Sequence, residues 1–236
     1  MPFGFFFDPR YFLFALPALA LVMFAQSRVR AAYGRYSQVR NAYGLTGGEA
    51  ARRLLDQAGL GYIPIRVVPG ELSDNYDPQQ KVLNLSAGVA NTPSVAALGI
   101  AAHEIGHALQ DAQAYAPLRA RASIVPAANI GSQLGFMIFF VGLIAAPLHF
   151  LAWVGVGLFS LVVLFTLVTL PVELNASQRA RQLLSSSGLA SPTEMQGVRS
   201  VLNAAALTYV AALAQAFATL LYFLDVMGVF SSSNRR

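Results

Sequence analysis

Hydrophobic and polar positions alternate in long blocks along the chain, and four of these blocks are apolar enough to form membrane helices. These apolar segments cover residues 11–25, 130–146, 150–170 and about 201–226. The third has no charged residue over 21 positions, which is the length that a helix needs to cross a bilayer. The fourth carries Tyr209, Gln215 and Asp225, so a span and a helix buried against the others both remain open.

The first apolar segment is short by itself. The apolar residues at 3–7 lengthen it to bilayer size, despite Asp8 and Arg10. A secretory signal peptide has its basic residues before the apolar core, whereas most basic residues here follow it. We therefore interpret the segment as a retained anchor, with a signal peptide as the alternative.

The polar region between the first two apolar segments has the pattern of a small α+β domain. Apolar residues at helical spacing predict a helix that follows Thr46 as N-cap and ends at Gly59. Two segments rich in β-branched residues predict strands, and the segment between them is rich in turn residues. The predicted strands lie within 63–70 and 81–86, and the connection is 72–80.

A further helix of this region carries two of the three histidines of the chain. We expect it to begin with Thr92 as N-cap and Pro93 as its first residue. His103 and His107 are four residues apart, so both imidazoles project from one helix face and can bind one cation. Glu104 lies about 100° round the helix beside that face, where its carboxylate can accept a proton from a metal-bound water. This is the chemistry of the HExxH motif, and polar contacts inside a helical bundle are the structural alternative.

Composition narrows the class of protein and the kind of metal site. Hydrophobic residues make up 56% of the chain and charged residues 11%, which is typical of an integral membrane protein. The chain has no cysteine, so a zinc site depends on histidine and carboxylate ligands. The net charge is +5, but the basic residues are scattered without an aromatic-interleaved patch, so we expect no nucleic-acid partner.

Membrane topology favours Glu173 as the third ligand of a catalytic zinc, which needs three protein ligands and an open position. Asp111 lies on the same helix as the histidine pair and is poorly placed to complete a tetrahedron, so we expect it to orient a ligand instead. His149 lies between the second and third apolar segments, and a bilayer-crossing hairpin carries it about 30 Å away. The chain then returns, and Glu173 is the first acidic residue. A helix-end charge at the interface is the alternative.

Three segments resemble the YugP-like family of membrane-bound neutral zinc metallopeptidases, and the resemblance extends over nearly the whole chain. They are NYDPQQKVLNLS, SVAALGIAAHEIGHALQ and LPVELNASQRA. The stretch from Glu173 to Ser177 is also similar to the E-x-x-A-D element of HtpX and the CAAX prenyl proteases, which are gluzincins. This similarity independently implies that Glu173 is a zinc ligand. Those relatives have aspartate at the position of Ser177, so the residue that orients the first histidine stays open among Ser177, Asn175 and Asp111.

The gluzincin resemblance also implies where substrate binds. The strand at 81–86 is a candidate edge strand that pairs with an extended substrate backbone, with Asn84 as the side-chain contact; an ordinary strand of a small sheet fits equally well. Tyr76 and Asp77 are further candidates to line the cleft, although their surroundings are also typical turn chemistry. Arg179 and Arg181 are candidates to stabilise an oxyanion or, alternatively, to anchor the helix at the membrane interface.

We therefore predict a mainly α integral membrane protein of about four transmembrane helices with a small α+β gluzincin-like catalytic region and a short sheet. The expected parts are an N-terminal anchor, a catalytic region with the HEIGH helix, a transmembrane hairpin, a helix with the third ligand, and a fourth transmembrane helix with the tail. Their boundaries are 1–26, 27–125, 126–171, 172–200 and 201–236.

Arginines next to the apolar segments predict that the catalytic region faces the cytoplasm, in a bacterial inner (plasma) membrane. They are Arg28, Arg30, Arg119, Arg121, Arg179 and Arg181, whereas the opposite side has Arg10, Arg235 and Arg236. The expected function is a membrane-embedded, Zn2+-dependent endopeptidase with Glu104 as general base, acting on proteins or peptides, membrane proteins included. The alternative is a non-catalytic membrane scaffold or peptide-binding adaptor that keeps a structural zinc site.

Overall fold

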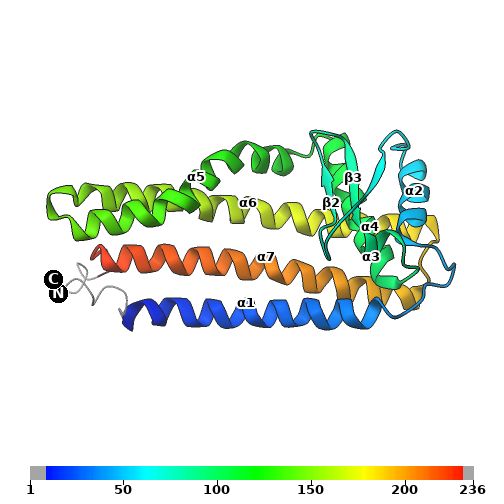
Figure 1. Cartoon of the computed structure of the whole chain (residues 1–236), viewed down its shortest axis with the longest axis horizontal. Coiled ribbons are helices and arrows are strands. Elements are labelled where there is room, and N and C mark those ends of the chain that lie inside the picture. The colour runs from blue at the N-terminus through cyan, green and yellow to red at the C-terminus, as the bar shows by residue number, and fades with distance from the viewer. Residues whose placement is uncertain (1–8, 231–236) are drawn as a thin grey trace. The chain divides into compact units, whose positions relative to one another are not determined.

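The computed structural model describes residues 9–230, and most of them are helical (Figure 1). The helices are α1 (Pro9–Tyr36), α2 (Gly47–Gln57), α3 (Ala87–Ala90), α4 (Val95–Ala112), α5 (Ala116–Ile144), α6 (Phe150–Ser187) and α7 (Pro192–Val226), with a 3-10 turn η2 (Ala146–Leu148). The strands are β1 (Ile65–Val68), β2 (Asn75–Asp77) and β3 (Val82–Ser86). The prediction of a mainly helical fold with a short sheet is confirmed.

Four helices of the described chain are long and apolar enough to cross a membrane: α1, α5, α6 and α7. Helix α5 contains most of the predicted second span and begins earlier, and α6 contains the whole predicted third span and ends later, with the 3-10 turn between them. The third span and the segment with Glu173 form one helix, because α6 continues without a break through Pro171. Helix α1 extends downstream to Tyr36, while the apolar stretch at 3–7 and the terminal arginine pair at 235–236 lie outside the described residues.

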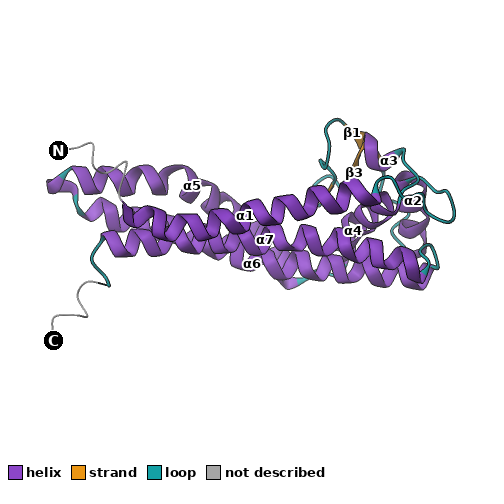
Figure 2. Cartoon of the chain, turned by 90° about the horizontal axis from the view of Figure 1, so that it is seen from below, coloured by secondary structure: helices purple, strands orange, loops and turns teal. Residues whose placement is uncertain are grey.

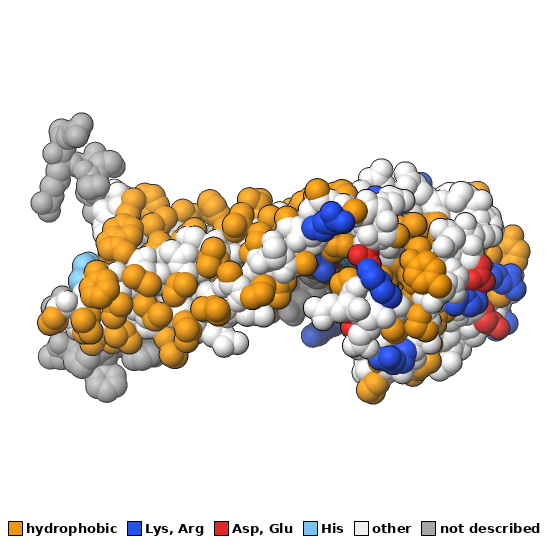
Figure 3. Space-filling view, turned by 90° about the horizontal axis from the view of Figure 1, so that it is seen from above, with side chains coloured by type: hydrophobic (Ala, Val, Ile, Leu, Met, Phe, Trp, Pro, Cys, Tyr) orange, Lys and Arg blue, Asp and Glu red, His pale blue; other side chains and the backbone are white. Residues whose placement is uncertain are grey.

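Residue contacts divide the chain into two compact units. Among the described residues, the first comprises 9–24, 119–170 and 208–230, and the second comprises 25–118 and 171–207. Hydrophobic side chains cover the long apolar helices, whereas Lys, Arg, Asp and Glu side chains gather over the unit that contains the sheet (Figure 3). A hydrophobic surface is suited to contact with lipid, and a charged surface is suited to contact with water.

The apolar unit is held together by close helix packing and aromatic contacts. A side chain at Gly155 of α6 would meet the backbone of α5, because its Cβ would lie 2.5 Å from the Phe139 nitrogen. Small residues at such positions let membrane helices approach closely. The rings of Phe139 and Phe223 are stacked with their centroids 3.9 Å apart. Asp225, the acidic residue of the fourth apolar segment, forms an ion pair with Arg10 at 3.5 Å.

The second unit contains the strands of the described chain in one three-stranded sheet (Figure 2). The order is β1-β3-β2, with β1 parallel and β2 antiparallel to β3. The strand predictions for β1 and β3 are confirmed, but two details are wrong. Strand β3 is central, not an edge strand, and the predicted connection 72–80 contains the short strand β2, because long-range pairing overrides its turn-like composition.

Helix capping in the second unit was predicted correctly for one helix and wrongly for the other. Thr46 caps α2 in a reciprocal capping box with Glu49, as predicted. Helix α4 begins later than predicted, because Ser94 is its N-cap and accepts a hydrogen bond from the Ala97 N–H at 3.1 Å. The Pro93 carbonyl accepts a hydrogen bond from the Asn41 N–H, and the Thr92 carbonyl accepts one from the N–H of Gly47, the first residue of α2. These bonds hold both residues outside α4.

Helix α4 lies at the centre of this unit. Its apolar residues are almost wholly excluded from solvent and form one core with α2, the sheet and parts of α6 and α7. Gly106 faces α6, and a Cβ there would lie 2.5 Å from the carbonyl oxygen of Ala176. The two helices therefore pack backbone to backbone, which brings the histidine face of α4 against the residues around Glu173.

Candidate metal centre

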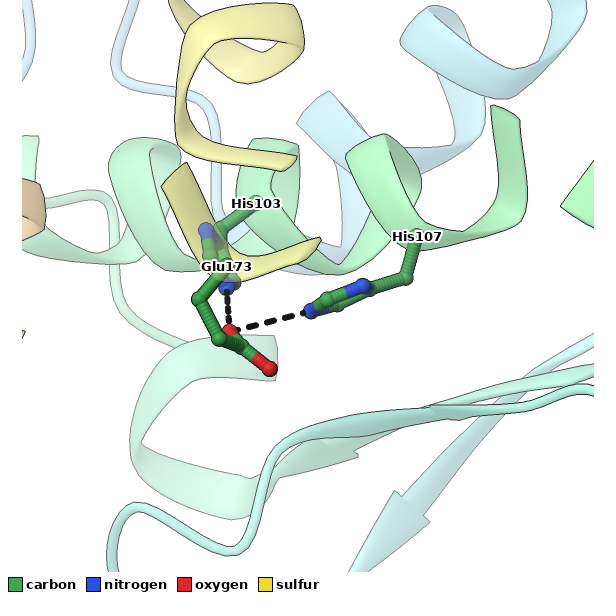
Figure 4. Close-up of side chains that lie close together, drawn as sticks. All are labelled: His103, His107 and Glu173. Carbon is green, nitrogen blue, oxygen red and sulfur yellow. Dashed lines mark hydrogen bonds and ion pairs between the residues drawn. The ribbon is translucent and has the colours of Figure 1, made fainter. Parts of the chain in front are cut away.

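Two histidines of α4 and one glutamate of α6 converge within the second unit (Figure 4). Their ligand atoms all lie within 4.8 Å of one another. Glu173 Oε2 lies 3.2 Å from His103 Nε2 and 3.4 Å from His107 Nε2. Two ligand atoms of a tetrahedral zinc, each bound at about 2.0–2.1 Å, lie about 3.3 Å apart. The donor set and its spacing therefore fit a zinc ion with one position left open.

The cluster is largely excluded from solvent. Glu173 is 4%, Glu104 8% and His107 9% exposed. A buried carboxylate is costly unless it is paired or coordinates a metal ion, and the two imidazoles partner Glu173 here. Burial works to lower the pKa of His107, but the hydrogen bond with Glu173 and the nearby Glu104 outweigh it and raise that pKa. The same carboxylates that favour a proton on this imidazole also favour a metal cation.

Each histidine directs Nε2 toward Glu173 and has a polar neighbour at Nδ1. The Ser177 hydroxyl lies 3.2 Å from His103 Nδ1, and Gln110 Oε1 lies 3.0 Å from His107 Nδ1. Such partners fix the orientation and tautomer of metal-binding imidazoles. Of the three candidates for orienting His103, the structure therefore brings Ser177 to it.

Gln110 is the residue that the sequence reasoning missed. It is fully buried, and its amide nitrogen donates to the Val172 carbonyl at 2.7 Å and to Asn175 Oδ1 at 3.0 Å. Its oxygen is therefore the acceptor for the Nδ1–H of His107, which leaves the Nε2 lone pair for a cation. The available signal was an amide three residues after His107 on a helix that is otherwise small and apolar at this point.

Asn175 and Asp111 lie elsewhere in the polar network. Asn175 reaches His107 only through Gln110, and its Oδ1 also accepts a hydrogen bond from Arg179 Nε at 2.7 Å. Asp111 Oδ2 accepts a hydrogen bond from the Tyr76 hydroxyl at 2.7 Å and forms an ion pair with Lys81. Asp111 thus contacts residues of the sheet region, where the sequence predicted contact with a zinc ligand.

The three candidate substrate-binding residues lie in different surroundings. Arg179 Nη1 also donates to Gln113 Oε1 at 2.6 Å, so this guanidinium joins α6 to the end of α4. Arg181 Nη1 donates to Asn203 Oδ1 on α7 at 3.4 Å. Asn84 Nδ2 donates to Asn75 Oδ1 on the neighbouring strand at 2.9 Å.

Glu104 lies next to the histidine pair and contacts the sheet. Its Oε2 accepts a hydrogen bond from the backbone N–H of Tyr76 at 3.0 Å. Burial raises the pKa of Glu104, and the nearby imidazoles offset part of that effect. A carboxylate with a raised pKa accepts a proton more readily than an exposed one.

Comparisons with known proteins agree with the membrane-length helices and the candidate metal cluster. A family profile described as "Putative neutral zinc metallopeptidase" matches residues 11–228. The "Putative membrane protease YugP" of Bacillus subtilis (strain 168) is 42% identical over 216 residues, which cover 92% of this chain and 96% of that protein. No solved structure matches the chain. With four membrane-length helices and a cluster that can hold a metal ion, the chain is an integral membrane protein that belongs to this family of zinc metallopeptidases.

Proposed function

We propose that the protein is a membrane-embedded zinc-dependent endopeptidase. His103, His107 and Glu173 hold the zinc ion, and Glu104 is the general base. The observation that carries this proposal is the convergence of three ligand atoms within 4.8 Å of one another, with Glu173 Oε2 at 3.2 and 3.4 Å from the two imidazoles, beside the buried Glu104. Membership of the zinc metallopeptidase family supports the reaction class.

The chain's own residues have distinct tasks in peptide-bond hydrolysis. Bound zinc supplies the Lewis acidity that lowers the pKa of water and polarises the substrate carbonyl. Glu104 accepts the water proton on Oε1, since Oε2 is occupied by the Tyr76 N–H. The water oxygen bonds to the carbonyl carbon, the C–N bond breaks, and Glu104 returns the proton to the leaving nitrogen. Ser177 and Gln110 hold the two imidazoles in place throughout.

The position of Glu173 on α6 supports substrates at the membrane interface. Leu170 ends the apolar stretch of this helix, and Glu173 follows three residues later, about 4.5 Å along the axis. The ligand therefore lies at the end of a membrane-spanning segment, within reach of polypeptide that enters or leaves the bilayer. Membrane proteins and membrane-associated peptides are the proposed substrates, and the flanking arginines support an active site on the cytoplasmic side of a bacterial inner membrane.

The contacts of the candidate substrate-binding residues suggest a different role for each. Arg179 connects through Asn175 and Gln110 to Nδ1 of His107, which supports a role in holding that imidazole, and contact with the developing oxyanion stays a prediction. Arg181 points to α7, which supports anchoring of the helix. A substrate strand cannot pair with β3, because β1 and β2 occupy both of its sides.

The ligand glutamate on a separate helix supports the likeness to gluzincins such as HtpX and the CAAX prenyl proteases. A scaffold or peptide-binding adaptor has no use for a general base, so the buried Glu104 beside the histidine pair argues against that alternative.

The decisive experiment compares the wild-type full chain with Glu104→Gln in detergent, using a peptide library as substrate. We expect Glu104→Gln to retain about one zinc per chain by elemental analysis and to lose cleavage by about a thousandfold or more, as removal of a general base and its electrostatic support does. Glu71→Gln is the matched control, since it changes an exposed glutamate. Cleavage that survives Glu104→Gln rejects the mechanism.

A further inference from the structure

The general base is in contact with the free edge of the sheet. Tyr76 of β2 lies opposite Leu83 of β3, and the Leu83 N–H donates to Pro64 on the β1 side. In an antiparallel pair, opposite residues either exchange both hydrogen bonds or direct their backbone groups away from each other. Tyr76 is of the second kind, so its N–H points outward from the sheet, and there it meets Glu104 Oε2 at 3.0 Å.

The side chain of Tyr76 also contacts α4, at a position nearer the end of that helix. The Tyr76 hydroxyl donates to Asp111 Oδ2 at 2.7 Å, and Lys81 pairs with that carboxylate oxygen. Glu104 and Asp111 are seven residues apart on α4, which is two helical turns, and so lie on one face. Tyr76 therefore spans two turns of α4: its backbone N–H donates to Glu104, and its hydroxyl donates to Asp111.

This contact adds to the restraints on a short strand. Within the described chain, β2 has three residues and pairs with β3 alone, with an Asn75–Asn84 side-chain bond and the burial of Tyr76 in the core as further restraints. The chain leaves it through Lys81, which has a φ of 54°, and a left-handed residue other than glycine persists only where its surroundings hold it. The ion pair with Asp111 is one such restraint. Burial and the Asp111 carboxylate also raise the pKa of the Tyr76 hydroxyl, so it remains a hydrogen-bond donor at neutral pH.

We propose that Tyr76, anchored by Asp111 and Lys81, is a positioning residue that fixes the carboxylate of Glu104 for proton transfer. The inference rests on the proposed function of Glu104 as general base. A glutamate side chain has three rotatable bonds, and the directed N–H of Tyr76 holds one carboxylate oxygen while leaving the other for water. Loss of the anchor lets β2 and its N–H move relative to α4, and a displacement of about 1 Å at a catalytic group costs up to about a hundredfold in rate.

Kinetics of the zinc-loaded full chain test the positioning role. Tyr76→Phe keeps the backbone N–H but removes the anchor, and Asp111→Asn weakens the same contact from the other side. We expect each to lower kcat about ten- to hundredfold, with KM within about twofold and zinc content unchanged. The double variant should be no slower than the slower single variant, because both remove one contact. Lys81→Arg should retain activity, whereas Lys81→Met should lose several-fold.

Matched controls are available for both substitutions. Tyr43→Phe changes an exposed tyrosine, and Asp56→Asn changes an exposed aspartate that pairs with Arg52. Neither should change kcat. A kcat within twofold of wild type in both Tyr76→Phe and Asp111→Asn overturns the proposal, as does a change confined to KM.

A readout without catalysis separates this proposal from the peptidase function. Protein labelled with 15N-tyrosine gives a Tyr76 amide signal that Tyr76→Phe identifies by its loss. An N–H that donates to a carboxylate resonates downfield, so Glu104→Gln should move this signal upfield, and Asp111→Asn should move it in the same direction. If no substrate is cleaved but both shifts occur, the positioning contact stands and the peptidase function fails. If Asp111→Asn leaves the signal unmoved, the positioning role is rejected.

Discussion

Two glycines, one in each unit of the molecule, allow the same backbone approach and serve different ends. Gly155 lets α6 lie against α5 in the apolar unit, and Gly106 lets α4 lie against α6 in the unit with the metal cluster. In the first case the close approach packs helices that have no hydrophobic drive to associate in lipid. In the second it sets the separation between a histidine pair and a carboxylate. The same kind of close helix contact can therefore position a candidate metal cluster when the cluster residues lie beside the glycine.

The largest effect on the second unit, with none on the first, is expected from removal of the Glu173 carboxylate. We expect Glu173→Ala to reduce bound zinc from about one per chain to near zero, because two imidazoles alone hold zinc weakly. Elemental analysis of purified protein measures this directly. His149→Ala is the control on the α5–α6 turn and should retain zinc. Zinc loss in the control together with zinc retention in Glu173→Ala contradicts the ligand set.

The two glycines can be compared directly by adding one methyl group to each. Gly106→Ala places a Cβ against the Ala176 carbonyl, so we expect a loss of about 1–3 kcal/mol in stability and at least tenfold weaker zinc binding. Gly155→Ala should cost a similar amount of stability by thermal unfolding, while the folded protein keeps its zinc affinity.

Gly157→Ala is the matched control, because nothing lies within 4 Å of a Cβ at that position. Gly157→Ala should change neither the stability nor the zinc affinity. Equal zinc affinity in the Gly106 and Gly155 variants removes the distinction between the two contacts.

A smaller effect is expected from the partners of the imidazoles. Gln110→Leu should weaken zinc binding about ten- to hundredfold, as loss of a partner of a metal-bound histidine typically does. The Gln110 amide also joins α4 to Val172 and Asn175, so Ser177→Ala, which removes a single contact to His103, should weaken zinc binding less. Competition with a chelator measures both, and the reverse order would falsify the view that Gln110 has the larger role.

The smallest effect concerns the capping box of α2, remote from the cluster. Hydrogen bonds from the Thr46 backbone and hydroxyl lower the pKa of Glu49. A lowered folded-state pKa adds stability that is complete above the ordinary glutamate value of about 4.3 and is lost as pH falls through the lowered pKa. Glu49→Gln should therefore reduce the Tm slightly at pH 7, and the difference from wild type should shrink in acid. A difference that grows in acid contradicts the assigned hydrogen bonds.

Local patterns were sufficient for the features that depend on nearby residues. Hydropathy over a bilayer length predicted the four long helices, and the capping box at Thr46 and the helical spacing of His103 and His107 are local as well. The structure brings Glu173 to the pair, as topology and resemblance both predicted, although its role as a ligand stays a prediction.

Features that depend on distant partners were missed or misplaced. Strand β2 has the composition of a turn and exists because it pairs with β3. Ser94 is the N-cap of α4 in place of Thr92, because the Thr92 and Pro93 carbonyl groups accept hydrogen bonds from Gly47 and Asn41. Gln110 also bonds to Val172 and Asn175 of α6, and Asp111 bonds to Tyr76 of β2, so these contacts depend on residues far from α4 in the sequence.

The hydroxyl of Ser177 and the amide of Gln110 are both electrically neutral, whereas many metal-bound histidines have a carboxylate behind them. A neutral acceptor draws the Nδ1 proton less strongly and leaves the imidazole a weaker electron donor. Two such imidazoles and one carboxylate offset only one of the two positive charges of a divalent ion. A divalent ion held by these residues would keep a net positive charge, which would favour strong electrophilicity and attract anionic groups.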